Sequence, residues 1–256
     1  MSICVYLLSE ENKNNPFFEK IQFLYDSHPN VDIHHIQVDE SQFNELPTPG
    51  EHLSYGIYYK LAIHRLCPAT GTVLHLDADT ICDGSLVDLI SLDMENWTLA
   101  AVPSSKPEIV RLDLPLDRPK FNVGLLIINL EQWKKNDVEE RARNYIRKNK
   151  PELPEQDAIN KILNKNDTTK YISPKYNTTK KWVDEFNRVN EEPIIIHYNG
   201  PDKPWRYITE RKKGEVWRKY ADQTPFKNYV TDKGVKEMIW IQLRNALRTL
   251  PVGVFN

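Results

Sequence analysis

The sequence has little of several features that would point to particular classes of protein. It contains only three cysteines among 256 residues, too few and too scattered for a disulfide framework or a zinc cluster. The formal net charge is −2, so no overall basic charge suggests a nucleic-acid partner. No stretch reaches the roughly 20 apolar residues that a membrane-spanning helix needs, and the start lacks the basic region of a signal peptide. We therefore expect a cytoplasmic protein that does not bind nucleic acid.

Segments typical of strands and helices alternate along most of the chain. Apolar runs predict strands at residues 3–8, 31–38, 71–77, 97–103 and 193–200, and a strand running into a helix at 121–135. Helical spacing predicts helices at residues 15–27, 54–68, 85–93, 137–149 and 154–164. Residues 104–120 resemble a surface loop long enough to form a lid. This order predicts an α/β fold, with a mostly parallel sheet and helices on both faces.

Two carboxylates, Asp77 and Asp79, end the apolar stretch "LHLDADT". Side chains two positions apart on a strand point the same way, so both can converge at the strand's carboxyl end, where open parallel sheets bind ligands. Hard oxygen donors favour Mg²⁺ or Mn²⁺, which in turn hold a nucleotide diphosphate. A helix N-cap is an equally good explanation of this pair taken alone.

The stretch "IIIHYNGPDKPW" ends a predicted strand with His197 and continues with Gly200 and Lys203. An imidazole is an acceptable Mn²⁺ ligand, a glycine permits close backbone approach, and a lysine can bind a phosphate. For an isolated histidine, a place in the core beside a proline-rich turn would be the favoured explanation.

Polar residues also gather at the start of two later elements. Asn122 opens the buried stretch "FNVGLLIINL", and an amide suits the hydroxyl groups of a sugar because it donates and accepts. Taken alone, an asparagine at a strand start is the commoner explanation. Glu155, Gln156 and Asp157 begin a predicted helix, and capping explains one of them but not the whole group.

Taken together and in this order, "LHLDADT", "FNVGLLIINL", "EQDAIN" and "IIIHYNGPDKPW" resemble glycosyltransferase family 8 over roughly residues 3–205. The resemblance implies a GT-A-type nucleotide-diphospho-sugar transferase fold and a retaining, metal-dependent transferase that uses UDP-sugars. It implies a catalytic domain at residues 1–205, followed by a basic, amphipathic extension at residues 206–256.

The resemblance also implies roles for individual residues. The implied ligands of Mn²⁺, or of Mg²⁺, are Asp77, Asp79 and His197. The implied donor-binding residues are Lys60, Asp77, Ala78, Asn122, Gly200 and Lys203. The implied catalytic residues around the transferred sugar are Asn122, Glu155 and Gln156.

The chain departs from the family's pattern in three places. Lys60 stands where the family commonly has an arginine, which keeps the charge but loses the bidentate fork. Glu155 stands where the family usually has an aspartate, one methylene shorter. The family's first β-α unit, whose end helps to hold uridine, has no counterpart here. Either the true start lies upstream, or other residues hold the base, or the chain binds its donor poorly.

The C-terminal extension bears on the acceptor. Residues 221–229 resemble a part of the extension of lipopolysaccharide-core glucosyl- and galactosyltransferases, and residues 235–250 place their apolar side chains on one stripe. Such a stripe can lie on the cytoplasmic face of the inner membrane, with basic residues meeting anionic headgroups. It can equally pack against the catalytic domain.

Three functions follow from these features. We expect a transferase that moves glucose or galactose from its UDP donor to a bacterial surface glycan, such as the lipopolysaccharide or lipooligosaccharide core. A non-catalytic sugar-nucleotide or glycan-binding protein of the same fold is the alternative. A metal-dependent hydrolase or nucleotidyltransferase is weaker, because no second carboxylate cluster suggests two metals.

Overall fold

The structure is a computed structural model that describes residues 3–12, 14–21, 28, 30–47, 54–104, 119–164, 168–179, 192–200, 203–205 and 212–227. The chain divides into two compact units, Met1–His197 and Tyr198–Asn256. Most of the predicted lid at 104–120 lies outside the described residues, as does the amphipathic stretch at 235–250. The predicted domain boundary after residue 205 stays a prediction.

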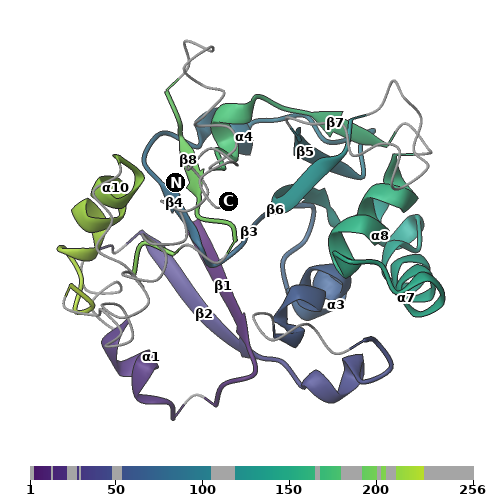
Figure 1. The fold of residues 1–256 in the computed structure, drawn as a ribbon, viewed down its shortest axis with the longest axis horizontal. Helices are drawn as coiled ribbons and strands as arrows, with labels where there is room; N and C mark the ends of the chain where they lie inside the picture. Colours follow the sequence, from purple (N-terminus) through teal and green to yellow (C-terminus); the bar gives the residue numbers. More distant parts are fainter. Residues whose placement is uncertain are drawn as a thin grey trace, which may run out of the picture. The chain divides into compact units, whose positions relative to one another are not determined.

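Strands and helices alternate through the first unit (Figure 1). The strands are β1 (Ile3–Ser9), β2 (Val31–Gln37), β3 (Thr72–Leu76), β4 (Thr80–Cys82), β5 (Leu99–Pro103), β6 (Phe121–Asn129), β7 (Thr169–Tyr171) and β8 (Ile195–His197). The α-helices are α1 (Pro16–Lys20), α3 (Ile63–Leu66), α4 (Val87–Ile90), α6 (Leu130–Lys135), α7 (Val138–Asn149), α8 (Pro154–Leu163) and, in the second unit, α10 (Lys212–Ala221). The 3-10 helices are η1 (Glu40–Phe43), η2 (Tyr55–Ala62) and η3 (Pro174–Tyr176).

The strand directions are mixed rather than mostly parallel, which corrects that part of the sequence prediction. β1 pairs with β2 and β5 pairs with β7 in parallel, whereas β6 runs antiparallel to both of its neighbours in the order β3-β6-β5-β7. β4 and β8 form a separate antiparallel pair. Alternation of elements along a chain predicts the α/β class, but it does not reveal which strands become neighbours or in which direction they run.

The central strands β5 and β6 are buried on both faces, which agrees with the predicted sheet that has helices on both faces. Successive side chains on each strand alternate between two hydrophobic clusters. Leu99 and Leu126 belong to the larger cluster, together with residues of η2 and α6–α8. Ala100 and Leu125 belong to the smaller cluster, together with Leu89 of α4. The two cores therefore share the same pair of strands.

The predicted helix at 54–68 forms as η2 followed by α3. The Ser54 side chain caps η2 by accepting a hydrogen bond from the backbone N–H of Gly56. The second half of η2 is buried, which places Lys60 in the interior at 3% exposure. After α3 the chain becomes extended at Cys67, directly before the predicted stop at Pro68.

A single carboxylate ties α3 to α7. Glu139 in α7 accepts hydrogen bonds from Arg65 in α3, at 2.7 and 2.9 Å, and from Arg143 one turn further along α7, at 2.8 and 2.9 Å. Arg143 also lies over the ring of Phe43, which joins the same contact to η1. Burial by itself raises the pKa of Glu139, but the hydrogen bonds from Arg65 and Arg143 outweigh it and hold the pKa below its usual range.

Replacing Glu139 with Gln is expected to lower the free energy of unfolding by about 1–3 kcal/mol at neutral pH, since hydrogen bonds between charged groups are lost. A carboxylate with a lowered folded-state pKa stabilises the fold above its unfolded pKa, and this stability disappears as pH falls through the folded value. The difference between wild type and Glu139→Gln, measured by urea unfolding, should therefore shrink below about pH 4.

Glu140 provides the matched control for this variant. It is the next residue of α7, its side chain is 68% exposed, and its ion pair with Arg147 spans 3.9 Å. Glu140→Gln should change the free energy of unfolding by less than about 0.5 kcal/mol. An equal loss in both variants, or a loss at Glu139 that does not depend on pH, would contradict the assigned role.

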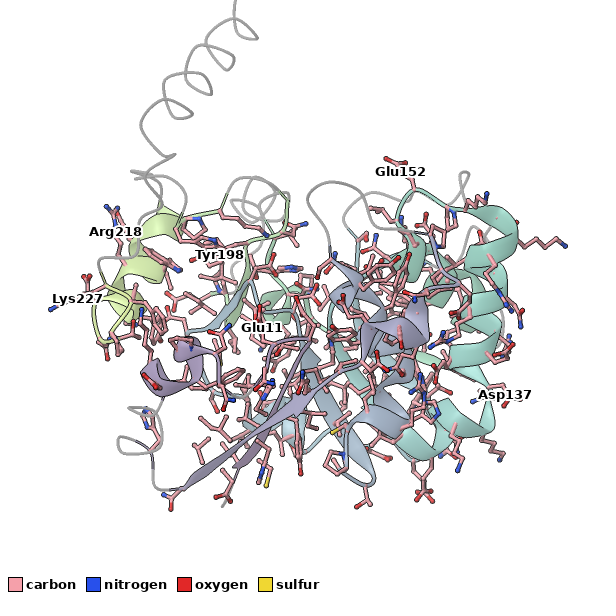
Figure 2. All side chains as sticks on the ribbon, turned by 90° about the horizontal axis from the view of Figure 1, so that it is seen from below. Glu11, Asp137, Glu152, Tyr198, Arg218 and Lys227 are labelled. Carbon is pink, nitrogen blue, oxygen red and sulfur yellow. The ribbon has the colours of Figure 1, made fainter. Side chains whose placement is uncertain are left out.

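The second unit is described in three short segments, residues 198–200, 203–205 and 212–227. The rings of Tyr198 and Trp205 meet edge to face, and Trp205 lies beside Trp217 of α10. Figure 2 labels Arg218 on the same helix. Within the residues that the structure describes, no helix combines the length and the apolar character needed to cross a membrane.

Candidate functional site

Asp77 and Asp79 lie in the turn between β3 and β4, not on a strand as predicted. β3 ends at Leu76, and the hydroxyl of Thr80 closes the turn by donating to the backbone carbonyl of Asp77 at 2.9 Å. The two carboxylates converge because the turn folds them toward the same side, and not because of strand alternation. Both remain accessible, with side-chain exposures of 32% and 20%.

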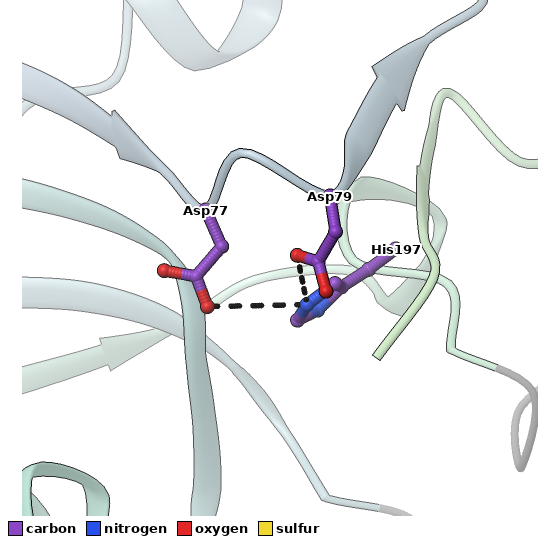
Figure 3. Close-up of side chains that lie close together, drawn as sticks. All are labelled: Asp77, Asp79 and His197. Atoms are coloured by element: carbon purple, nitrogen blue, oxygen red, sulfur yellow. Dashed lines mark ion pairs between the residues drawn. The ribbon is translucent and has the colours of Figure 1, made fainter. Parts of the chain in front are cut away.

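The pairing of β4 with β8 brings the third residue of the cluster. Thr80 and His197 are register partners in this pair, so the imidazole arrives next to Asp79. Its Nε2 lies 3.1 Å from Asp79 Oδ1 and 3.9 Å from Asp77 Oδ2. Figure 3 shows both aspartates turned toward the imidazole. One ligand atom from each of the three residues lies within 4.8 Å of the others. The structure thus brings together the three residues that the resemblance implied.

A glycine makes room for the imidazole. Gly124 of β6 accepts a hydrogen bond from the backbone N–H of Asp77 at 2.8 Å. A Cβ atom at this position would lie 2.1 Å from Cε1 of His197. This separation is far shorter than van der Waals contact, so an added methyl group and the ring cannot both keep these positions. Gly124 was not among the predicted site residues, although it interrupts an apolar strand, where glycine often marks a close approach.

Gly124→Ala should force the His197 ring out of the cluster. We expect a loss of about 1–3 kcal/mol in the free energy of unfolding from overpacking and at least tenfold weaker Mn²⁺ binding, about the effect of disturbing a ligand's orientation. Calorimetric titration with Mn²⁺ and urea unfolding measure the two effects. The double variant Gly124→Ala/His197→Ala should regain the stability but not the binding. Wild-type Mn²⁺ affinity in the single variant would contradict the steric explanation.

The buried ammonium of Lys60 sets the charge of Asp77. Its Nζ lies 2.8 Å from Asp77 Oδ1 and also donates to the backbone carbonyl of Val123 at 3.3 Å. Burial raises the pKa of Asp77, but Lys60 outweighs it and holds the pKa below its usual range. In return, Asp77 and Glu155 raise the pKa of Lys60 despite its burial. Both partners therefore stay charged, and one oxygen of Asp77 is already engaged.

A second histidine lies beside the cluster and was not predicted. His75, on β3, places its Nε2 3.9 Å from Asp77 Oδ1. Burial, together with the charge of Lys60, lowers the pKa of His75 to about 4, so the ring is neutral at physiological pH. His75 belongs to the apolar strand predicted at residues 71–77, and nothing in its local pattern distinguishes it from a core residue.

The residues predicted around the sugar also come together. Asn122 Nδ2 donates to Gln156 Oε1 at 3.0 Å, which joins the start of β6 to the first turn of α8. Burial raises the pKa of Glu155, against the opposing charge of Lys60. Asp157, the third polar residue of this group, is fully buried and pairs with Lys120 at 3.1 Å. The polar start of α8 therefore divides into residues that face the site and one that supports the fold.

Three further predicted donor-binding residues lie within the described residues. Ala78 is exposed in the turn between the two aspartates. Gly200 has a φ of +87°, a conformation that favours glycine. The ammonium of Lys203 donates to the backbone carbonyl of Tyr198 at 2.8 Å and lies over the ring of Trp205. Gly200 and Lys203 belong to the second unit, and their contacts with a donor stay predictions.

The chemistry of the cluster suits a divalent cation. Two carboxylate oxygens and one imidazole nitrogen form a mixed hard and borderline donor set, which Mn²⁺ accepts readily. The partial exposure of both aspartates leaves room for further oxygen ligands from a substrate. Asp77, Asp79 and His197 would hold such a cation through Oδ2, Oδ1 and Nε2.

Comparison with known proteins identifies a family and several relatives. Residues 2–209 match the family described as Glycosyl transferase family 8. A putative glycosyltransferase of Haemophilus influenzae is 29% identical over 66% of this chain and 54% of its own length. General stress protein A of Bacillus subtilis is 26% identical over 76% of this chain and 74% of its own. The lipopolysaccharide 1,3-galactosyltransferase of Salmonella typhimurium is 26% identical over 78% of this chain and 66% of its own length. The chain thus spans about half the length of the first of these relatives.

Solved structures share the fold. The galactosyltransferase LgtC, in complex with donor and acceptor sugar analogues, aligns with a TM-score of 0.72 at 18% identity, over 87% of this chain and 96% of that one. The WbbM bifunctional glycosyltransferase aligns with a TM-score of 0.71 at 17% identity, over 91% of this chain and 52% of that one. The predicted GT-A fold is confirmed. With most of its length matched, the chain belongs to glycosyl transferase family 8.

Proposed function

We propose that the protein is a retaining, Mn²⁺-dependent hexosyltransferase, which transfers glucose or galactose from a UDP-sugar to a bacterial surface glycan such as the lipopolysaccharide core. The observation that carries this proposal is the convergence of Asp77, Asp79 and His197 at one point. The amide pair of Asn122 and Gln156 supports it, because paired amides suit the hydroxyl groups of a sugar.

The charges of the site fit the departure of a nucleoside diphosphate. Breaking the anomeric bond builds negative charge on a phosphate oxygen, which a bound divalent cation would neutralise without proton transfer. Lys60 keeps Asp77 ionised and therefore keeps a ligand available. A preorganised electrostatic contact of this kind is typically worth about 3 kcal/mol.

Glu155 bears on the route to retention of configuration. A covalent route needs an ionised carboxylate under the anomeric carbon, whereas burial raises the pKa of Glu155. We therefore favour attack from the face that the leaving group vacates, with UDP accepting the proton of the acceptor hydroxyl. In this route the Gln156 carbonyl oxygen stabilises positive charge that develops on the sugar ring.

The lipopolysaccharide transferases among the relatives support a glycolipid acceptor. We propose that the protein works at the cytoplasmic face of the inner membrane, with residues 235–250 as the contact.

The alternative to a transferase is a non-catalytic sugar-nucleotide or glycan-binding protein. The three candidate cation ligands argue against it, because binding alone has little need for a group that stabilises a departing diphosphate.

The deciding experiment measures UDP release from UDP-glucose and UDP-galactose, each with and without Mn²⁺ and with and without a lipopolysaccharide-core acceptor. Transfer predicts release that requires both Mn²⁺ and acceptor. Release without acceptor would indicate hydrolysis, and calorimetric binding of the donor without turnover would indicate a binding protein. Vesicle co-sedimentation of the full chain and of a chain ending at Asn228 tests the membrane contact separately.

A further inference from the structure

We propose that Asn177 is a positioning residue that fixes the ring orientation and the tautomer of His197, so that Nε2 presents its lone pair to the cation. This inference rests on the proposed function, because it concerns the same cluster. Asn177 contacts the cluster through His197 and acts through that histidine. It lies directly after η3 and is 1% exposed.

Backbone pairing brings Asn177 to the histidine. The segment after η3 runs alongside β8, with the Thr178 N–H donating to the Ile195 carbonyl at 2.9 Å and the His197 N–H donating to the Thr178 carbonyl at 3.1 Å. β8 is therefore held by β4 on one side and by this segment on the other. The side chain of Asn177 consequently reaches the ring nitrogen that faces away from the two aspartates.

A chain of amide groups extends from this contact. Asn177 Oδ1 lies 2.9 Å from His197 Nδ1, and Asn177 Nδ2 donates to Asn122 Oδ1 at 2.9 Å. Asn122 in turn donates to Gln156 Oε1 at 3.0 Å. The cation cluster and the amide pair predicted to hold the sugar are thus joined through one buried asparagine.

A backbone N–H group determines which way the amide side chains of Asn122 and Asn177 are oriented. The N–H of Gly124 can only donate, and it donates to Asn122 Oδ1 at 2.9 Å. The same oxygen must therefore also accept from Asn177, which places the NH₂ group of Asn177 toward Asn122. The carbonyl oxygen of Asn177 is left facing His197 Nδ1.

An acceptor that faces Nδ1 requires that Nδ1 carries the ring hydrogen. In the neutral imidazole the other nitrogen, Nε2, then has a free lone pair, which is the form that binds a metal ion. Nε2 is the nitrogen that faces Asp77 and Asp79. Partners of this kind typically contribute about 10- to 100-fold to metal affinity.

The first experiment reads the tautomer without metal or donor. The full chain is prepared with isotope-labelled histidine, and nitrogen NMR is recorded about two pH units above the pKa of a free imidazole. The signals of His197 are assigned by comparison with His197→Gln. Wild type should show hydrogen on Nδ1. Asn177→Ala should show a mixture of tautomers, whereas Asn177→Asp, which keeps an acceptor oxygen, should retain hydrogen on Nδ1.

The second experiment titrates the same proteins with Mn²⁺ alone. Asn177→Ala should bind about 10- to 100-fold more weakly than wild type. Asn164→Ala is the matched control, since Asn164 is equally buried and hydrogen-bonds with Pro119 and Tyr171 outside the cluster. It should lose stability and keep its Mn²⁺ affinity. If Asn177→Ala does not fold, Asn177→Ser is compared with Asn177→Asp. With its shorter side chain, the serine variant should bind Mn²⁺ more weakly than the aspartate variant, and equal affinities would count against the positioning role.

The outcomes separate this inference from the proposed function. Wild-type tautomer and wild-type Mn²⁺ affinity in Asn177→Ala would overturn the positioning role while leaving the transferase proposal intact. A wild-type protein that binds no Mn²⁺ would overturn the proposed cation, and the NMR comparison would still decide whether Asn177 fixes the histidine.

Discussion

Asp79→Asn should reduce Mn²⁺-dependent UDP release by about 10²- to 10³-fold, the loss that follows when one preorganised electrostatic contact is removed from a transition state. The amide keeps the shape of the side chain but removes the charge that faces His197 at 3.1 Å. Asp79 is a better choice than Asp77, because removing the charge of Asp77 would also leave the ammonium of Lys60 buried without its carboxylate.

The measurement should be made over a wide range of Mn²⁺ concentration. A variant that has only lost affinity recovers its rate at high Mn²⁺, whereas one that has lost the stabilising charge does not. Glu95→Gln is the matched control, since it removes one exposed carboxylate of the same unit and should leave the rate unchanged. Near-wild-type turnover in Asp79→Asn would contradict the proposed role of the cluster.

Asp157→Asn should lower the free energy of unfolding by about 3–5 kcal/mol, the cost of removing one partner from a buried ion pair. Asp157 is 0% exposed and Lys120 is 1% exposed, with their charged atoms 3.1 Å apart. The pair joins α8 to the residue before β6, so it holds Gln156 of α8 near Asn122 of β6.

Urea unfolding measures this loss. Replacing both partners by apolar residues, as in Lys120→Met/Asp157→Leu, should recover much of the stability, because no charge is then left buried alone. Glu131→Gln, at an exposed position in the first turn of α6, should stay within about 0.5 kcal/mol of wild type. A cost below 1 kcal/mol in Asp157→Asn would show that the pair does not support the start of α8.

Local patterns predicted the main elements well. The strands around Ile3–Ser9, Val31–Gln37 and Phe121–Asn129 all form where apolar runs predicted them. The break between α6 and α7 follows from Asp137, labelled in Figure 2, which adopts a positive φ of 48°. The short strands β4 and β7 were missed, because neither lies in an apolar run like the one that predicted the equally short β8.

The site was predicted in part, for a physical reason. Asp77, Asp79 and His197 stand in recognisable motifs, so resemblance indicates them. Asn177 sits after a 3-10 turn in a polar stretch, and its importance depends on backbone pairing with β8, more than 15 residues later in the chain. Contacts that depend on such distant pairing leave no local trace in the sequence.

The two oxygens of Asp77 have different neighbours, and this difference restricts which ions suit the cluster. Oδ1 is held by Lys60, so only Oδ2 is directed toward His197. A large ion such as Ca²⁺ gathers six to eight oxygens and often takes both oxygens of one carboxylate. To do so here, Ca²⁺ would have to displace the buried ammonium of Lys60. We therefore expect the cluster to prefer a smaller ion that needs only one oxygen from each carboxylate.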